Sequence, residues 1–249
     1  MSSSVDDTTC CPVLELRQYV LHPGQRDTLI ALFDREFVET QEAAGMRVIA
    51  QFRDLDRPDV FTWLRGFADM PSRAAALTAF YDGPVWAAHR NAANATMISS
   101  DDVRLLRPAR PGSGFLLRGA HRPDLNATAI VPLLFVATIY SVTVPSGRFA
   151  EFFDRSMTPE LVSSGARPIA VLETEPSVNN FPRLPVREGE HAFVWFARFS
   201  DVTAYDRHVS ALEASRQWRE TVHSALDQQI ERPAEILRLV PTSRSLLPA

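Results

Sequence analysis

The chain has 249 residues, of which 45% are hydrophobic and 22% charged, values that support a globular fold with a sizeable core. Its formal net charge of −4 lacks the basic footprint expected of a protein that binds nucleic acids or anionic membranes. The longest apolar run, at 130–140, is shorter than the about 20 residues that span a bilayer. We therefore expect no nucleic-acid or membrane partner.

Cysteine usage and the start of the chain both favour a cytoplasmic location. Cys10 and Cys11 are adjacent, which suits the usual disulfide geometry poorly, so we expect no disulfide framework. The first residues have neither the basic start nor the apolar run of a secretory signal. All basic residues are arginine, a compositional hint of a bacterial origin.

The first predicted element is an alternating strand over 13–21, which ends at Pro23-Gly24. Apolar residues at helical spacing then predict a helix over 25–44, with Gly45 as its C-cap. Asp69 suits a helix N-cap, and another helix is expected to begin near Gly83-Pro84. Further strands are predicted over 46–54, 59–67 and 102–107.

The second half of the chain repeats this pattern. Five blocks recur in the same order, among them ALFDREF (31–37) with EFFDRSM (151–157) and FTWLRGFAD (61–69) with FVWFARFSD (193–201). Collinear matches of this kind predict a tandem duplication. The second unit is predicted to have strands over 133–144, 166–174, 191–199 and 235–240, a helix over 147–163, and an N-cap at Asp201.

Each unit therefore has the order β-α-β-β-α-β of a ferredoxin-like fold. The fold class is α+β, and we place the units at 13–109 and 132–241. The Pro-, Gly- and Arg-rich segment 110–131 is predicted to be a linker. Residues 1–12 and 242–249 are predicted to be loose tails.

The first unit resembles the NIPSNAP family. The resemblance rests on LELRQYVLHPG, AAGMRVIAQFRDLDRPDVFTWLRGFADM and AFYDGPVWAAHRNAANATM, and it covers about 13–109. It implies the dimeric α+β barrel superfamily, in which two ferredoxin-like sheets face each other, here within one chain or in a homodimer. Some relatives at the level of the fold are cofactor-independent oxygenases, haem-degrading enzymes or cyclases. The second unit resembles the family far less closely.

Strand alternation sorts the side chains of unit one into two faces. We place the mixed polar and aromatic face on the side of the sheet without helices, as the wall of a pocket inside the barrel. Its members are Glu15, Arg17, Tyr19, Ile49, Gln51, Arg53, Phe61, Trp63 and Arg65. The opposite face, expected to pack against the helices, contains Leu14, Leu16, Val48, Ala50, Phe52 and Leu64.

From this face we predict a small-molecule enzyme that acts on an anionic or enolisable metabolite, as in biosynthesis, with no metal or organic cofactor. Glu15, Tyr19 and His89 are the candidate catalytic residues, because carboxylate, phenol and imidazole can move a proton. Arginines could hold an anion or an enolate. The candidate substrate-binding residues are Arg17, Gln51, Arg53, Trp63, Arg65, Trp86, Arg90, Tyr140 and Trp195.

Other interpretations of these residues stay open. The charges of the polar face could simply join the two sheets, and His89 and Arg90 could lie on a helix surface. The chain could instead be a non-catalytic metabolite-binding or scaffold protein whose linker, with Phe115-Leu116-Leu117, docks a partner, or a haem-linked monooxygenase-like enzyme. Glu220, His223 and Asp227 share one helical side, but a single helix cannot close a metal site. His22, His121, His191 and His208 suggest no site.

Overall fold

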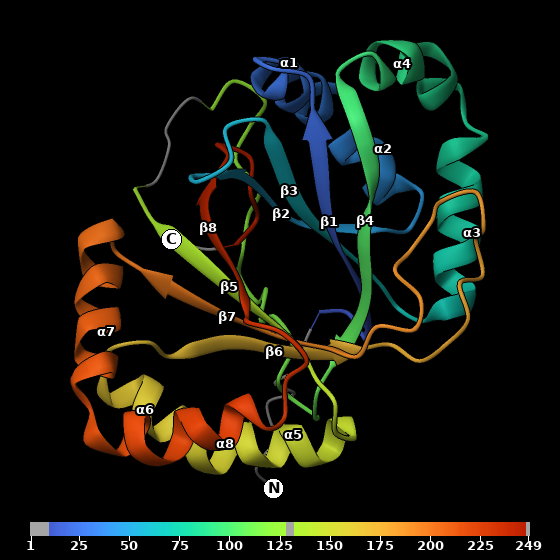
Figure 1. Ribbon diagram of the computed structural model, residues 1–249. Coiled ribbons are helices and arrows are strands. Elements are labelled where there is room, and N and C mark those ends of the chain that lie inside the picture. Colours follow the sequence, from blue (N-terminus) through green and yellow to red (C-terminus); the bar gives the residue numbers. More distant parts are fainter. Residues whose placement is uncertain (1–9, 128–131, 248–249) are drawn as a thin grey trace, which may run out of the picture.

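The computed structural model describes residues 10–127 and 132–247 (Figure 1). Their antiparallel strands close into one barrel in the order β1-β3-β2-β8-β5-β7-β6-β4. The strand orders β4-β1-β3-β2 and β8-β5-β7-β6 are the same ferredoxin-like order, one from each half of the chain. The predicted α+β barrel of two tandem ferredoxin-like units is therefore confirmed, and a single chain closes it.

The elements of unit one agree with the predicted order. The final strand begins at Met97 rather than at 102, because it stays paired with β1 as far as Leu21. The elements are β1 (Val13–Leu21), α1 (Arg26–Leu32), η1 (Phe33–Phe37), α2 (Val38–Ala43), β2 (Arg47–Asp54), β3 (Val60–Phe67), α3 (Met70–Tyr81), α4 (Pro84–Asn94) and β4 (Met97–Pro108).

Unit two repeats the arrangement, with a much longer connection between its second and third strands. The β6–β7 connection covers 175–191, whereas the β2–β3 connection covers only 55–59. The elements are β5 (Leu134–Ser141), α5 (Ser146–Phe152), η2 (Phe153–Met157), α6 (Thr158–Ser163), β6 (Pro168–Thr174), β7 (Ala192–Phe199), α7 (Val202–Ala214), η3 (Trp218–Val222), α8 (His223–Asp227) and β8 (Glu235–Pro241).

The first helical region of each unit contains a π-helical turn at the same place. Phe33–Phe37 and Phe153–Met157 are the two segments, and they coincide with the repeated FDREF and FDRSM motifs. Each turn buries its first and last side chains against the sheet. The duplicated sequence thus preserves an irregularity of the helix as well as the regular elements.

The predicted helix ends are confirmed in both units. The Asp69 carboxylate accepts a hydrogen bond from the Ser72 backbone N–H at 2.7 Å, and Asp201 accepts one from Ala204 at the same distance. Gly45 has a φ of +99°, a left-handed conformation that glycine adopts without steric cost after a helix. These local signals fix where each layer of helices begins and ends.

The interior of the barrel is an apolar core shared by the two units. Leu14, Leu16 and Phe52 pack there in one cluster with Phe135 and Phe196. The helices cover the outer face of the sheet, with α1–α4 on unit one and α5–α8 on unit two (Figure 1). On the same inner strand faces, the buried Gln18 and Arg104 donate to Glu235 at 3.1 and 3.0 Å, so the interior is apolar at its centre and charged toward one end.

The predicted assignment of the two strand faces in unit one is wrong except at Val48 and Ile49, which lie against the helices and inside as predicted, because a β-bulge interrupts β2 between Val48 and Ala50. Tyr19, Phe61 and Trp63 pack with the apolar side chains of α1–α4. Both faces of a barrel strand are buried, so alternation separates the faces without showing which one meets the helices. The side chains facing the helices are Glu15, Arg17, Tyr19, Gln51, Arg53, Phe61, Trp63 and Arg65, while Ile49 lies inside with Leu14, Leu16, Ala50, Phe52 and Leu64.

The linker and the C-terminal tail, which were predicted to be loose, pack against one end of the barrel. Phe115 of the linker is buried against Phe196, with ring centroids 5.1 Å apart, so it is not available to dock a partner. Leu247 joins the same apolar cluster, and the Leu246 N–H donates to the Ile49 carbonyl. The C-terminal tail is therefore packed up to the last described residue, Leu247.

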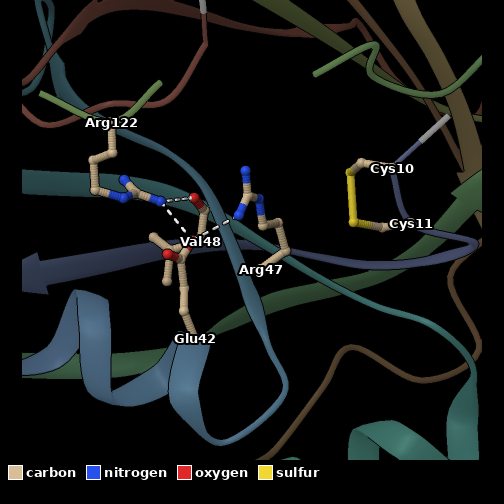
Figure 2. The surroundings of a disulfide bond; sticks show 6 residues. All are labelled: Cys10, Cys11, Glu42, Arg47, Val48 and Arg122. Carbon is tan, nitrogen blue, oxygen red and sulfur yellow. Dashed lines mark hydrogen bonds and ion pairs between the residues drawn. A yellow bond between two sulfur atoms is a disulfide. The ribbon is translucent and has the colours of Figure 1, made fainter. Parts of the chain in front are cut away.

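The region around the cysteines also differs from the prediction. The sulfur atoms of Cys10 and Cys11 form a disulfide although the two Cα atoms are only 3.8 Å apart (Figure 2). Cys11 is buried, and a Cβ atom at Gly66 would lie 2.4 Å from its sulfur, so this close approach requires a glycine. The end of the predicted N-terminal tail is thus part of the core, while residues 1–9 lie outside the described part.

A pair of buried arginines fastens the linker and the C-terminal segment to unit one. Arg122 donates to the Val48 carbonyl and the Glu42 carboxylate (Figure 2). Arg244 donates to the Asp34 carbonyl and pairs with Glu39.

Among the described residues, no helix has the length and apolar character needed to cross a bilayer.

Candidate functional site

The space between sheet and helices in unit one contains a buried ionic cluster centred on Glu15. One oxygen of this carboxylate, Oε2, accepts from Arg17 Nη1 at 2.6 Å and from Arg65 Nε at 2.7 Å. The other, Oε1, accepts from Arg73 Nε at 2.7 Å. All four side chains are at most 1% exposed. We call these four residues the arginine cluster.

Neutral groups surround the arginine cluster. The Tyr19 hydroxyl accepts from Arg17 Nε at 2.9 Å, and Gln41 Oε1 accepts from Arg65 Nη1 at 3.0 Å. The Trp63 ring lies beneath both guanidiniums, with its centroid 5.6 Å from Arg17 and 5.1 Å from Arg65. One carboxylate does not balance three guanidinium charges. The aromatic faces and the oxygens of Tyr19 and Gln41 therefore provide additional stabilising contacts for the arginines.

The electrostatics of the cluster do not favour Glu15 or Tyr19 as a base. Burial opposes ionisation of Glu15, but attraction by Arg65, Arg17 and Arg73 prevails and holds its pKa far below the ordinary value of 4.5. Burial raises the pKa of Tyr19, so its hydroxyl stays neutral. A strongly stabilised carboxylate is a weak proton acceptor, which leaves this cluster better suited to holding charge than to moving protons.

Strand register shows which residues of unit two occupy the same positions. Arg17 pairs with Trp63 across β1 and β3, and Thr138 pairs with Trp195 across β5 and β7. Arg17 therefore corresponds to Thr138. By the same register Tyr140 corresponds to Tyr19.

None of the four charged residues has a charged counterpart in unit two. By register, Glu15 corresponds to Val136 and Arg65 to Ala197. Arg73 and Tyr205 each follow a capping aspartate by four positions. Long side chains are thus replaced by short ones at three of the four positions.

A cavity of about 630 Å³ lies where unit two lacks the arginine cluster. Its size suits a small organic molecule, and aliphatic and aromatic side chains dominate its wall. Charged residues at its rim are mainly acidic, with Glu213, Asp227 and Glu231 against Arg232. The remaining lining residues include Val136, Thr138, Tyr140, Leu161, Trp195, Phe199, Tyr205, His208, Leu212, Trp218 and Ile236.

Two histidines line this cavity, His208 on α7 and the exposed His223 on α8, and His208 is the buried one. Its Nδ1 lies 2.9 Å from Ser164 Oγ, whose own proton is directed at the carbonyls of Glu160 and Leu161. Because that hydroxyl already donates elsewhere, we assign the ring proton to Nδ1, which makes Nε2 the unprotonated nitrogen. Burial lowers the pKa of His208 below 6.5, so the ring is neutral at pH 7.

Two hydrogen-bond donors line the same cavity. Burial raises the pKa of Tyr140 to about 12, an effect that the neighbouring Trp195 indole slightly opposes, so the phenol remains a donor at neutral pH. The Trp195 Nε1–H is buried and makes no well-formed hydrogen bond with any described group. A base and a phenol therefore line one largely apolar space, with the Trp195 N–H buried beside the phenol.

Comparison with known proteins identifies unit one. The family model NIPSNAP matches residues 14–111, as the E-L-R-x-Y strand and the W-L-R-G-F strand predict. Residues 14–111 are a NIPSNAP domain. No curated protein matches the sequence.

Solved structures support the fold of the whole chain. A candidate monooxygenase from Lactobacillus acidophilus NCFM has 12% identity and a TM-score of 0.53, covering 96% of this chain and 100% of its own. An anthrone oxidase-like protein has 13% identity and a TM-score of 0.55, covering 92% and 91%. The encapsulated DyP-type peroxidase of Mycobacterium smegmatis has 9% identity and a TM-score of 0.54, covering 96% and 95%. At these identities the likeness concerns the fold alone.

The other predicted residues of the NIPSNAP domain lie apart from the arginine cluster. Arg53 pairs with Asp27 at 2.8 Å, and Gln51 donates to Asp34. His89 is half-buried, with Nε2 3.4 Å from Glu36, and Arg90 is exposed on the same helix. Trp86 packs against Phe37, Phe80 and Tyr81 as part of the helical core.

The structure brings together five of the predicted site residues within the NIPSNAP domain: Glu15, Arg17, Tyr19, Trp63 and Arg65. Two others, Tyr140 and Trp195, lie in the second unit. Arg73 and His208 are absent from the predicted set. Arg73 carries a sequence signal, because it shares one face of α3 with the buried Ala76, Leu77 and Phe80. His208 has a weaker signal of the same kind, since it shares one face of α7 with the partly buried Tyr205 and Leu212.

The acidic and histidine residues near the C-terminus do not gather around one point. Glu220 pairs with Arg216 at 2.8 Å, and His223 Nδ1 lies 3.1 Å from Asp227. Within the described residues, no group of three or more histidine, cysteine or acidic side chains could hold a metal ion.

Proposed function

We propose that this protein is an enzyme that removes a proton from a small, largely apolar and enolisable molecule in the cavity of unit two. The observation that carries the proposal is the orientation of His208, whose Nδ1 is engaged by Ser164 while the side chain lines the cavity. A neutral imidazole with its free nitrogen in an apolar space is a competent general base.

The proposed step transfers one proton. His208 Nε2 takes a proton from the carbon beside a carbonyl group, and the C–H electron pair moves onto the carbonyl oxygen to form an enolate. The phenol of Tyr140 would stabilise that oxygen as its charge develops, with the neighbouring Trp195 indole positioning the phenol. Return of the proton to the same or another carbon regenerates neutral His208 and completes an exchange or an isomerisation.

The lining of the cavity supports an uncharged substrate. Its wall is mainly apolar, and acids outnumber arginines at the rim. The predicted preference for an anionic metabolite therefore does not fit this cavity. The fold neighbours described as a candidate monooxygenase and as an anthrone oxidase-like protein favour aromatic ketones among enolisable molecules.

Deuterium exchange tests this function without knowledge of the natural substrate. Purified protein in D₂O is mixed with β-tetralone or benzoylacetone, and loss of the α-proton signal is followed by NMR. We expect acceleration by the wild type and a reduction of roughly 10²- to 10⁴-fold in His208→Gln. The rate should fall as the pH drops through the lowered pKa of His208, because protonation removes the base.

His89→Gln is the matched control, because His89 is a half-buried histidine outside the cavity. It should exchange the probes as fast as the wild type. Equal exchange by His208→Gln and the wild type would exclude His208 as the base. Binding of the probes with no exchange by the wild type would instead identify a carrier.

A further inference from the structure

The arginine cluster has an excess of positive charge that the protein does not neutralise. Three guanidiniums face one carboxylate, and all four groups are almost completely buried. Unpaired charge in a low-dielectric interior is costly, so a cluster of this kind favours a bound anion. Arginine also matches the planar geometry of carboxylate and phosphate oxygens.

The cover of the cluster comes from unit two. The β6–β7 connection, residues 175–191, extends beside α3 (Figure 1). Asn179 Oδ1 and Asn180 Oδ1 accept from Arg73 Nη1 at 3.1 and 2.8 Å. Asn180 also donates to the Met70 carbonyl, and Phe181 packs on Tyr81 with ring centroids 6.0 Å apart.

Asn179 separates Arg73 from a second cavity. This cavity, of about 430 Å³, lies between β4 and the β6–β7 connection, and Asn179 forms part of its wall. Its charged lining is mixed, with Arg107, Arg187 and His191 beside Glu175, Glu188 and Glu190. The two asparagine oxygens are neutral acceptors and hold a guanidinium less strongly than an anion would. Movement of Asn179 would therefore connect Arg73 to a space large enough for a small ligand.

We propose that the NIPSNAP domain binds a small oxyanion through Arg73, with Arg17 and Arg65 behind it, in place of the asparagine oxygens of the β6–β7 connection. The ligand class is a carboxylate or phosphate whose oxygens replace those of Asn179 and Asn180. Entry is from the 430 Å³ cavity. This site is separate from the cavity containing His208, so the anion-binding proposal does not depend on whether that cavity is catalytic.

Isothermal titration of the full chain with inorganic phosphate, sulfate and benzoate tests the proposal. We expect the wild type to bind at least one of the three, and Arg73→Met to bind it about tenfold or more weakly because one charge-assisted pair is lost. The double change Asn179→Ala with Asn180→Ala should bind more tightly, since it removes the internal competitors. A preference for phosphate or for benzoate tells the two ligand classes apart.

Arg53→Met is the matched control, because Arg53 lies on the same side of the sheet but pairs with Asp27 at the surface. Its affinity should equal that of the wild type. Unchanged affinity in Arg73→Met would overturn the proposal. The absence of binding heat with all three anions, in both the wild type and the double asparagine variant, would also overturn it. This second measurement decides the question even if Arg73→Met does not fold.

Discussion

The two halves of the barrel share one backbone plan but fill the space between sheet and helices in opposite ways. In unit one Glu15 and three arginines occupy it, whereas in unit two short or uncharged residues leave a cavity of about 630 Å³. Trp63 and Trp195 hold equivalent positions in both. A few side chains at matched positions therefore decide whether a ferredoxin-like unit has a charged core or a binding cavity.

The comparison also explains why the halves are not interchangeable. Unit one has alanines, Ala44 and Ala76, at the positions that correspond to Ser164 and His208. The long β6–β7 connection belongs to unit two but caps the arginines of unit one. Duplication thus allowed one unit to keep charge and the other to acquire a base.

Removing the carboxylate of unit one should have the largest effect on stability. Glu15→Gln leaves three buried guanidiniums without their shared anion, so we expect a loss of about 3–5 kcal/mol in the free energy of unfolding. Urea denaturation followed by circular dichroism measures it. A loss below about 1 kcal/mol would mean that the cluster is not the electrostatic unit described above.

Transplanting the residues of unit two sharpens the same comparison. A variant with Glu15→Val, Arg17→Thr, Arg65→Ala and Arg73→Tyr removes all four charges together. Because no charge is left unpaired, it should lose less stability than Glu15→Gln alone despite its poorer packing. It should also open an apolar space that a hydrophobic dye can enter, which fluorescence titration would detect.

Filling the cavity of unit two should reduce binding with little change in stability. In Val136→Phe the added ring projects from β5 into empty space, so we expect the free energy of unfolding to stay within about 1 kcal/mol of the wild type. Affinity for β-tetralone should fall about tenfold or more, as measured by NMR line broadening. Unaltered affinity would show that the probe binds elsewhere.

Changing Asp34, which lies in the π-helical turn of unit one, should have a smaller effect on stability, and that effect should depend on pH. Burial raises its pKa from 3.8 to about 6, so the folded state holds a proton that the unfolded state releases. Its contribution to stability is full below pH 4 and is lost as the pH rises through 6. Asp34→Asn should therefore match the wild type near pH 4 and exceed it by about 2 kcal/mol at pH 7.

Thermal unfolding between pH 4 and 8 would measure this difference. Asn can keep the contact in which Gln51 donates to the side chain at 3.1 Å. A gap between variant and wild type that does not grow with pH would exclude Asp34 as the titrating group.

Much of the fold could be predicted from local patterns. The capping aspartates, the left-handed glycines and the alternation of strands all depend on a few neighbouring residues, so the order β-α-β-β-α-β and the tandem repeat were readable without coordinates. The helix over 25–44 was located correctly, although its π-helical turn was not foreseen. The NIPSNAP motifs likewise marked the domain that the family model matches.

The site was less predictable, because it depends on contacts between distant segments. Strand alternation places Glu15, Arg17 and Arg65 on one face, but Arg73 joins them from a helix 58 positions away from the carboxylate. His208 gains its role only from Ser164, 44 positions earlier. Neither spacing produces a motif.

The sequence by itself determined the elements, their order and, apart from the β-bulge in β2, the two faces of the strands in unit one, because these follow from local backbone and side-chain preferences. Only the tertiary structure decided which face meets the helices, since both faces are buried and burial alone does not distinguish them. The tertiary structure also showed that the cavity lies in unit two. The reason is that the side chains between sheet and helices fill that space in unit one but leave part of it empty in unit two.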